Sequence, residues 1–264
     1  MADAPWLRAC KRLPIGGQAR FRCCGRTPAG VLYNNPDAWE MWCHRCKTTE
    51  RERKQFVQAN VVEHQKPQVD LPEDAQNLHE LAPELLNHIY TFLISKGIMP
   101  DMLPEDTQWT QSLKRILFRV GPSSWIGRST SPHINPKWLT FGPAVQYAIA
   151  QPVSPAAVSE VVLTEDYLSA LKLAYVSSKW GGSQKLPIAL LGTRLSPTLK
   201  ASLVSMSCPV LLMLDGDDAG YKGMATARLA LRPFVPVREY SLPGKDPKDL
   251  MISQILEGFN GATH

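Results

Sequence analysis

The sequence predicts an α/β protein with three parts: a parallel sheet flanked by helices at the C-terminal end, a mixed α+β subdomain before it, and a small β unit at the N-terminus. Three observations support this. From residue 158, apolar strands alternate with helical patterns. Residues 77–157 mix one helical pattern with β-prone runs. Five of the six cysteines lie within the first 46 residues. Regular β-α alternation favours a parallel sheet covered on both faces.

The N-terminal part is predicted to form a β-hairpin followed by a metal-binding C-x-x-C turn. The β-prone runs at 30–33 and 39–42 are separated by NNPDA, a good turn sequence, and lead into Cys43-x-x-Cys46. Residues 60–76 are polar with two prolines and no periodicity, which is typical of a linker. We therefore expect a metal-binding domain at 1–59, a linker at 60–76, a subdomain at 77–157 and a final domain at 158–264.

The subdomain is predicted to start with a helix. Residues 77–97 have a helical pattern that Pro83 starts or breaks and Gly97 ends. Residues 113–120 favour a strand, 123–131 a loop or a strand, and 136–142 a loop.

The final domain consists of four predicted β-α units. Its strands are near-continuous apolar runs, as expected for strands buried on both faces. The strands are expected at 160–165, 186–192, 209–215 and 237–242, and the helices at 167–180, 196–206, 219–234 and 246–258.

Composition and charge narrow the class of protein. No apolar run approaches the ~20 residues needed to span a bilayer, and the N-terminus lacks an apolar signal-peptide core, so we expect a soluble cytoplasmic protein with no membrane partner. The net charge is +5, and residues 1–66 are basic whereas 67–105 are acidic. Such blocks indicate separate modules, and a basic module suits a polyanion, although ordinary solvated surface gives the same pattern.

The clustered cysteines predict one structural zinc ion. Tetrahedral zinc needs four donors, so two further groups must join Cys43 and Cys46. We favour the adjacent pair just before the hairpin, with Cys10 as its competitor and His44 as a further option; a reduced thiol cluster is the alternative to zinc. A unit this small requires the metal to fold. The expected ligands are Cys23, Cys24, Cys43 and Cys46.

Acidic residues follow two predicted strands of the final domain and recur in a later loop. Parallel sheets carry their chemistry beyond the carboxyl ends of the strands. Carboxylate oxygens suit Mg²⁺, and one or two such ions could orient a triphosphate for phosphoryl or nucleotidyl transfer. The alternative is a set of helix caps and loop acids, and Asp218 in particular could be a cap. These acids are Glu165, Asp166, Asp215, Asp217, Asp218, Asp246 and Asp249.

Basic residues in two regions are candidates for contact with nucleic acid. The hairpin unit interleaves arginines and lysines with Tyr33, Trp39 and Trp42, a composition that suits single-stranded nucleic acid, although the tryptophans could instead form the core of the hairpin. Four residues of the subdomain could line a template path or simply be solvated: Arg115, Arg119, Arg128 and Lys137.

These motifs resemble the TOPRIM domain of DnaG-type primases. Glu165, ALLGT at 189–193, DGDDAG at 215–220 and LPGKDPKDL at 242–250 occur in the order of that domain, and WIGR at 125–128 and INPKWLTFG at 134–142 are similar to segments that precede it. A zinc ribbon, a linker, a basic subdomain and TOPRIM in this order resemble bacteriophage primases. The sequence departs from the family at Asp166, where glycine is usual, at Ser169, where an acid is common, and in lacking a first C-x-x-C.

The resemblance implies a DNA primase that makes short RNA primers on single-stranded DNA for phage replication. It implies that Glu165, Asp215 and Asp217 are catalytic, that Asp246 and Asp249 shape a second metal or nucleotide position, and that the zinc ribbon recognises the template. Asp218 is a further candidate for cofactor binding, with a helix cap as the alternative. The expected partners are single-stranded DNA, ribonucleoside triphosphates and a separate replicative helicase, since the sequence has no G-x-x-x-x-G-K-[ST] motor motif. The alternatives are a TOPRIM nuclease and a non-catalytic recombination mediator.

Overall fold

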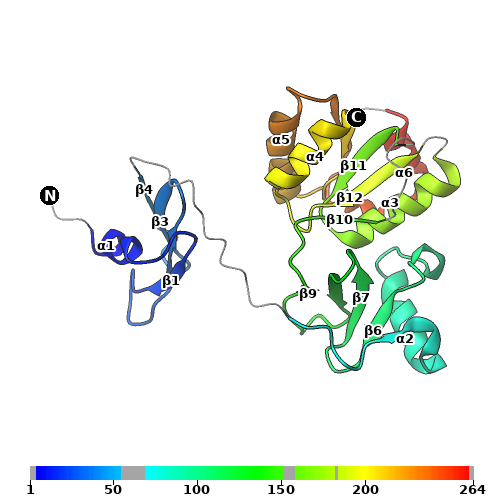
Figure 1. The fold of residues 1–264 in the computed structure, drawn as a ribbon, viewed down its shortest axis with the longest axis horizontal. Helices are drawn as coiled ribbons and strands as arrows, with labels where there is room; N and C mark the ends of the chain where they lie inside the picture. Colours follow the sequence, from blue (N-terminus) through cyan, green and yellow to red (C-terminus); the bar gives the residue numbers. More distant parts are fainter. Residues whose placement is uncertain (1–3, 55–68, 151–157, 182–183, 262–264) are drawn as a thin grey trace. The chain divides into compact units, whose positions relative to one another are not determined.

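The computed structural model describes residues 4–54, 69–150, 158–181 and 184–261. The chain divides into two compact units, Met1–Pro67 and Gln68–His264, which are described separately below (Figure 1). The expected domain end at residue 59, most of the linker at 60–76 and the boundary at residue 157 lie outside the described residues.

The first unit is a four-stranded antiparallel sheet with one helix packed on it. The predicted hairpin is present, because Val31 pairs with Trp42 and Leu32 with Met41. Side chains of the helix, including Trp6 and Cys10, join Leu32 and Met41 in the core. The helix and the two outer strands are not predicted from the sequence because they are short, and the last strand, TERER, is wholly polar. The elements are α1 (Pro5–Lys11), β1 (Gln18–Phe21), β2 (Gly30–Asn34), β3 (Ala38–Cys43) and β4 (Thr49–Arg53).

The second unit begins with an antiparallel five-stranded sheet in chain order. The predicted helix starts at Pro83 and ends at Ile94, with Gly97 at φ 72° shortly after it. Residues 136–142 were predicted as a loop and instead contain a strand that pairs with β8, because ladder partners compensate for a proline-rich flank. The elements are β5 (Gln76–Asn77), η1 (Leu78–Glu80), α2 (Pro83–Ile94), η2 (Pro100–Met102), β6 (Gln108–Thr110), β7 (Arg115–Arg119), β8 (Trp125–Ser129) and β9 (Trp138–Phe141).

The rest of the second unit is the predicted parallel sheet. Its strand order is β10-β12-β11-β13-β14; the last four are parallel and β10 runs antiparallel to β12. The strands are β10 (Ala148–Ile149), β11 (Glu160–Thr164), β12 (Lys185–Ala189), β13 (Val210–Leu212) and β14 (Val237–Glu239). The helices are α3 (Tyr167–Trp180), α4 (Pro197–Met206), α5 (Asp218–Leu231) and α6 (Ile252–Phe259). The predicted fold class is confirmed: an α/β parallel sheet flanked by helices, preceded by a mixed α+β part and a small β unit.

One predicted helix of this sheet is shorter than expected. Residues 246–258 form a 3₁₀ turn, η4 (Pro247–Asp249), before α6 starts at Ile252. The two elements separate at Leu250 and Met251, whose backbone is extended with ψ angles of 146° and 155°.

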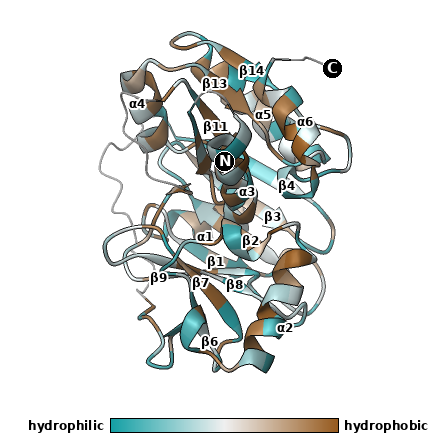
Figure 2. Cartoon of the chain, turned by 90° about the vertical axis from the view of Figure 1, so that its right-hand side faces the viewer, coloured by the Kyte–Doolittle hydropathy of each residue, from teal (hydrophilic) through white to brown (hydrophobic). Residues whose placement is uncertain are grey.

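Helices cover both faces of the parallel sheet. Side chains of α4 and α5 pack on the face that carries Val161 and Leu212, and those of α3 and α6 pack on the face that carries Val162 and Leu211 (Figure 1). Figure 2 shows hydrophobic residues concentrated in β7, β11 and β13, whereas the surrounding helices carry residues of both kinds.

The helix α3 is buried on almost every side. Leu173 and Val176 face the parallel sheet, whereas Leu168 and Leu171 join a core with Ile116 and other residues of the antiparallel sheet. A helix that is apolar all round is typically enclosed by protein. The helix therefore joins the two sheets of the second unit into one packed body, and any group at its N-terminus lies beside both.

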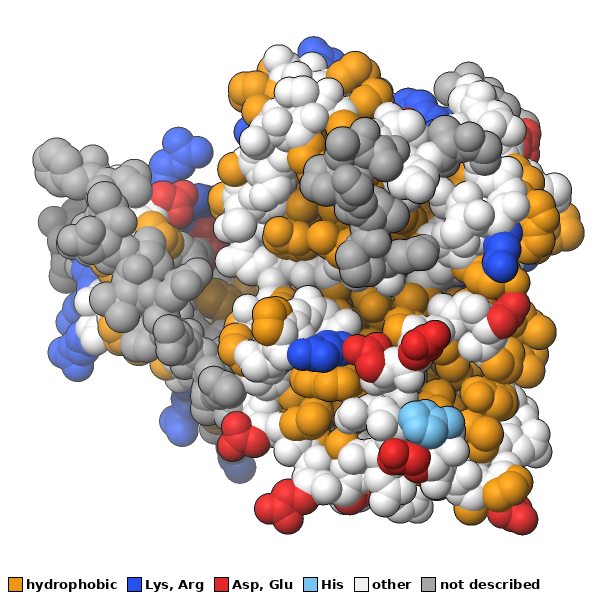
Figure 3. Space-filling model, turned by 45° about the vertical axis from the view of Figure 1, so that its right-hand side comes forward, with side chains coloured by type: hydrophobic (Ala, Val, Ile, Leu, Met, Phe, Trp, Pro, Cys, Tyr) orange, Lys and Arg blue, Asp and Glu red, His pale blue; other side chains and the backbone are white. Residues whose placement is uncertain are grey.

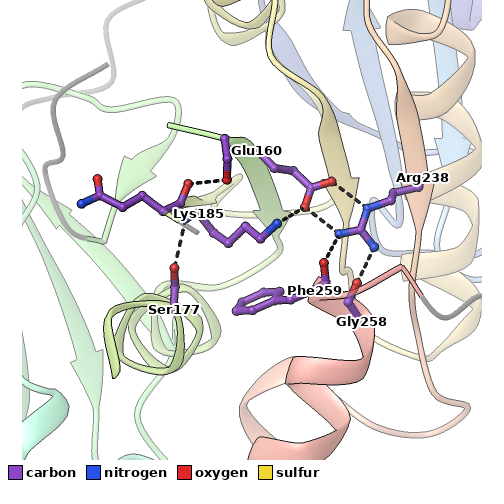
Figure 4. A network of polar contacts seen from close by, with 8 residues as sticks. Glu160, Ser177, Lys185, Arg238, Gly258 and Phe259 are labelled. Atoms are coloured by element: carbon purple, nitrogen blue, oxygen red, sulfur yellow. Dashed lines mark hydrogen bonds and ion pairs between the residues drawn. The ribbon is translucent and has the colours of Figure 1, made fainter. Parts of the chain in front are cut away.

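A charged network closes the amino ends of the parallel strands (Figure 4). Glu160, at the start of β11, is buried and accepts hydrogen bonds from Arg238 at 2.7 and 2.6 Å and from Lys185 at 3.0 Å. Arg238 also donates to the carbonyl oxygens of Gly258 and Phe259 at the end of α6. Strands and helix are thus held together by one carboxylate and two cations.

The surface of the second unit carries exposed hydrophobic side chains. Figure 3 shows them on one face of the molecule, among scattered acidic side chains. Among the residues that the structure describes, every helix is too short or too polar to cross a membrane.

Candidate functional site

Acidic side chains converge at the carboxyl ends of the parallel strands. Glu165 and Asp166 follow β11, Asp215 follows β13 closely, and Asp246 lies in the loop after β14. One carboxylate oxygen from each of Asp166, Asp215 and Asp246 lies within 4.8 Å of the other two. We refer to these three residues as the acidic trio.

Two glycine-containing loops bring Asp215 and Asp246 together. The amide of Gly216 donates to the carbonyl oxygen of Lys245 at 2.9 Å, and the amide of Gly244 donates back to Gly216 at 2.7 Å. A Cβ atom at Gly216 would lie 2.0 Å from the carbonyl oxygen of Leu242, so no other residue fits there without moving the loop. This close backbone approach explains the glycine after Asp215.

Glu165 lies against the trio. Its Oε1 accepts a long hydrogen bond from the amide of Asp215 at 3.4 Å. A Cβ atom at Gly220 would lie 2.0 Å from the Asp215 carbonyl oxygen and 2.8 Å from Glu165 Oε1, so this glycine makes room for both. Burial, together with the nearby charges of Asp217 and Asp246, raises the pKa of Glu165 above its usual value.

Asp215 is the member of the trio that most needs a cation. Its Oδ1 is buried and has no hydrogen-bond partner among the described residues. Burial and the charges of Asp246 and Glu165 raise the pKa of Asp215 to about 7, against the opposing effect of Lys248. A buried carboxylate oxygen without a donor is costly, and a hard divalent cation with oxygen ligands would satisfy it. The donor set therefore fits Mg²⁺.

The other predicted acids lie outside the trio. Asp217 is exposed and caps α5, accepting a hydrogen bond from the Gly220 amide at 2.8 Å. Asp218 occupies the exposed first turn of α5, so the cap position is held by Asp217. Asp249 is exposed at the end of η4. Of the predicted catalytic residues, the structure brings Glu165 and Asp215 into contact and places Asp217 at the rim.

Sequence reasoning missed Lys248, and it counted Asp166 among the strand-end acids without giving it a role. Asp166 caps α3 by accepting from the Ser169 amide at 2.9 Å, and it also pairs with Lys248 at 2.9 Å. Its signal in the sequence is its position directly after Glu165 at a strand end. Nothing in GKDPKDL distinguishes the buried Lys248 from the exposed Lys245.

A pocket of about 330 Å³ adjoins the trio. Its apolar side is formed by Ile126, Trp138 and Leu191, and its polar side by Glu165, Asp166 and Asp215. The antiparallel sheet thus contributes Ile126 and Trp138, and the parallel sheet contributes the carboxylates and Leu191.

Of the four predicted template-binding residues, Arg128 lies nearest the pocket. Its guanidinium is 5.5 Å from the centre of the Trp138 ring, and its Nε is buried without a hydrogen-bond partner among the described residues. Burial lowers the pKa of Arg128 from its usual value, and the charge of Asp166 opposes that effect. Lys137, the residue directly before Trp138, is exposed.

The other two arginines have structural partners. Arg115 is buried and donates to the carbonyl oxygens of Gly127 at 3.0 Å, Lys137 at 3.2 Å and Pro136 at 2.7 Å. Its guanidinium therefore stabilises the loop before β9 and does not lie at the surface, in contrast to the predicted template contact. Arg119 is exposed and donates to Gly121 and Pro122 in the adjacent turn.

In the first unit, the four favoured cysteines come together. The Sγ atoms of Cys23 and Cys46 are 3.7 Å apart, and those of Cys24 and Cys43 are 3.6 Å apart. With zinc–sulfur bonds of ~2.3 Å, the sulfurs of a tetrahedral site lie about 3.8 Å apart. The spacing therefore fits a zinc ion at the centre of the four.

The electrostatics of the cluster also suit a cation. The hydroxyl and amide of Thr48 lower the pKa of Cys46 to about 6, whereas hydrogen bonding with Cys46 raises the pKa of Cys23 to about 12. The thiols are linked by hydrogen bonds, and a bound metal ion would displace the protons of those bonds. The competing donors lie elsewhere: Cys10 is buried and donates to the carbonyl oxygen of Tyr33, and His44 packs against Trp42.

The first unit also has a hollow of about 370 Å³ on its sheet, lined by Arg20, Tyr33 and His44 among others. Lys11 and Lys54 lie over the ring of Trp39, each about 5 Å from its centre. Cationic and aromatic side chains thus stand together on a small β surface, as in sites that bind single-stranded nucleic acid.

Comparisons with known proteins return primases among solved structures. A scan against protein-family models finds no match, and a search of curated proteins finds none. The Aquifex aeolicus primase, comprising its zinc-binding and RNA polymerase domains, is 14% identical over 98% of this chain and 83% of its own, with a TM-score of 0.49. The DnaG catalytic core is 16% identical over 65% of this chain and 70% of its own, with a TM-score of 0.47.

A phage protein is also similar. The primase fragment of the bacteriophage T7 primase–helicase is 14% identical over 87% of this chain and 91% of its own, with a TM-score of 0.42. Because every one of these TM-scores lies below 0.5, we argue function from the geometry of the site.

Proposed function

We propose that this protein is a DNA primase of the TOPRIM type, which joins ribonucleotides into short primers on single-stranded DNA for phage replication. The observation that carries the proposal is the acidic trio at the carboxyl ends of the parallel strands, with a buried Asp215 oxygen that has no partner among the described residues. Converging carboxylates beside a nucleotide-sized pocket suit Mg²⁺-dependent nucleotidyl transfer.

Asp215, supported by Glu165, is the residue that would hold the ion. When bound, Mg²⁺ supplies Lewis-acid chemistry that favours attack of a 3′-hydroxyl on an α-phosphate and stabilises the leaving pyrophosphate. The pocket would orient the nucleotide with its base against Trp138 and its phosphates toward Asp166 and Asp215. Arg128, whose guanidinium lies over the Trp138 ring, would contact the incoming nucleotide or the template.

The zinc unit would select the template. Its cysteine cluster fits one structural zinc ion, and the hollow beside Arg20 and Tyr33 offers a surface for unstacked bases. In this proposal a replicative helicase on a separate chain supplies the single strand.

The test of the activity is primer synthesis by purified protein. Labelled ribonucleotides, Mg²⁺ and a set of single-stranded templates should yield short RNA products from the wild type. Asp215→Asn should reduce the yield by roughly 10²-fold or more, because the metal ligand is lost. Glu84→Gln, in the exposed first turn of α2, which contributes no residue to the pocket, is the matched control and should leave the yield unchanged.

The same assay separates the alternatives. Nicking of plasmid without nucleotide triphosphates, lost in Asp215→Asn, would indicate a nuclease. DNA binding with neither synthesis nor nicking would indicate a mediator. Full synthesis by Asp215→Asn would overturn the proposed site.

The zinc site has its own test. Metal analysis of the purified chain should find one zinc ion, and Cys24→Ser should lower the zinc content, because it removes one of four donors. Cys208→Ser is the control, since Cys208 lies in the second unit and donates to the carbonyl oxygens of Met206 and Val158. Undiminished zinc in a Cys24→Ser/Cys43→Ser double variant would exclude this ligand set.

A further inference from the structure

A lysine side chain stands among the carboxylates of the candidate metal site. Lys248 Nζ lies 2.9 Å from Asp166 Oδ2 and also pairs with Asp246, and its side chain is only 10% exposed. The buried Lys172 donates to the carbonyl oxygen of Lys248 at 2.6 Å, which fixes the backbone of η4. Both the ammonium group and the backbone of Lys248 are therefore held in place.

The lysine divides the acidic trio into two parts. Asp166 is engaged at both oxygens, since Oδ1 accepts from the Ser169 amide and Oδ2 pairs with Lys248. Asp215, in contrast, keeps its buried Oδ1 without a partner among the described residues. Asp166 and Asp246 thus pair directly with a cation of the protein, whereas Asp215 has a buried oxygen that no described residue contacts by a hydrogen bond.

The ammonium stays charged in this position. Burial favours its neutral form, but the Asp166 and Asp246 carboxylates outweigh burial and raise the pKa of Lys248 above its usual value. Removing the lysine would leave two neighbouring carboxylates to repel each other.

We propose that Lys248 is the resident second cation of the acidic site, so that this site binds a single divalent ion, through Asp215 and Glu165, and not a pair. This inference rests on the proposed metal-dependent function. With Glu165 the site holds four carboxylates; the ammonium and one divalent ion nearly balance their charge, whereas the ammonium and two divalent ions would exceed it. In two-metal sites the ions lie about 3.5–4 Å apart, and the ammonium already occupies the space between Asp166 and Asp246.

The test counts manganese ions on the full-length zinc-loaded protein. Mn²⁺ replaces Mg²⁺ as a probe, and its binding is followed by electron paramagnetic resonance of the free ion and by calorimetry. Wild type should bind one Mn²⁺ at this site, and Asp215→Asn should bind it roughly tenfold more weakly or worse. Lys248→Met, which keeps the chain length but removes the charge, should bind two.

Lys245→Met is the matched control, because Lys245 lies three residues away in the same loop and is exposed. It should bind one Mn²⁺, like the wild type. Two Mn²⁺ ions on the wild type would overturn the inference. So would a single, tighter Mn²⁺ on Lys248→Met, because the lysine would then be a placeholder that the metal displaces.

A second variant keeps the inference testable should Lys248→Met fold poorly. In Asp166→Asn the amide oxygen can still cap α3, and the affinity for Mn²⁺ should change by less than about threefold, because Asp166 is not a metal ligand in this scheme. A loss of roughly tenfold or more would assign Asp166 to the metal and overturn the inference.

The outcome separates from that of the proposed function. If the Mn²⁺ counts are as predicted but no primer is made, the inference about Lys248 holds and the proposed primase activity is wrong. If primers are made but the wild type binds two Mn²⁺ ions, the proposed activity holds and the inference about Lys248 is wrong.

Discussion

The two ends of the parallel sheet handle charge in opposite ways. At the amino ends, one buried carboxylate, Glu160, is held by two cations, Arg238 and Lys185. At the carboxyl ends, three carboxylates share one cation, Lys248, and a buried oxygen of Asp215 has no donor among the described residues. The same kind of side chain is fully compensated at one end and left short of positive charge at the other.

The difference separates a structural cluster from a functional one. A satisfied buried network stabilises the fold and leaves little for a ligand to gain. An under-compensated cluster costs stability, and a bound cation recovers that cost. Loss of a carboxylate is therefore expected to lower the stability of the fold at the amino ends. At the carboxyl ends it is expected to raise stability and to weaken metal binding.

The largest effect on stability is expected at the amino end. Glu160→Gln should lower the free energy of unfolding by roughly 3–5 kcal/mol, because Arg238 and Lys185 lose their buried counter-ion. Denaturant unfolding at neutral pH measures this. Glu239→Gln is the control: its pair with Arg228 is 3.5 Å long and partly exposed, so the loss should stay below about 1 kcal/mol. Equal losses in the two variants would erase the contrast between buried and surface pairs.

At the carboxyl end the sign should reverse. In magnesium-free buffer at pH 8, Asp215→Asn should raise the free energy of unfolding by on the order of 1 kcal/mol or more. The buffer contains no chelator, so that the zinc stays bound. The pKa of Asp215 is raised to about 7 from an ordinary value near 4. Its contribution to stability is therefore full below about pH 4 and is lost as the pH rises through 7.

The variant lacks this titration, so its advantage should shrink as the pH falls from 8 to 5. Thermal unfolding at both pH values provides the measurement. Added Mg²⁺ should stabilise the wild type and not the variant. A destabilised Asp215→Asn at pH 8 would mean that Asp215 is already compensated by the protein.

The smallest effect concerns the redundancy of the amino-end network. Lys185→Met should cost only about 1 kcal/mol, since Arg238 keeps two hydrogen bonds to Glu160. Unfolding in denaturant again gives the number. A cost as large as that of Glu160→Gln would show that the lysine, and not the arginine, carries the network.

Much of this arrangement could be predicted from the sequence. Apolar strands ending in acids predict where Asp215 and Glu165 emerge, because the carboxyl ends of parallel strands lie at one edge. The hairpin sequence and C-x-x-C likewise predict the position of the cysteine cluster. These signals are local, with the strand, the turn and the functional residue within a few positions of each other.

Side-chain pairing across the fold could not be predicted in this way. Lys248 and Asp166 lie 82 residues apart in the chain, and no local pattern indicates that they meet. Arg115 was interpreted as a surface cation, but the structure buries it; residues 115–118 are all buried, so the strand has no alternation from which this could be predicted. Strand β9 was missed because prolines flank it, although it pairs with β8, the preceding strand in the chain.

The contact between Asp166 and Lys248 has a consequence for how such sequences change over time. An acid at one position is tolerated because a base stands at the other, so the two positions should vary together among relatives of this chain. A sequence with glycine after the strand-end glutamate should lack the lysine, and a sequence with the lysine should carry the acid. The pair would then mark a distinct branch, recognisable from two letters far apart in the chain.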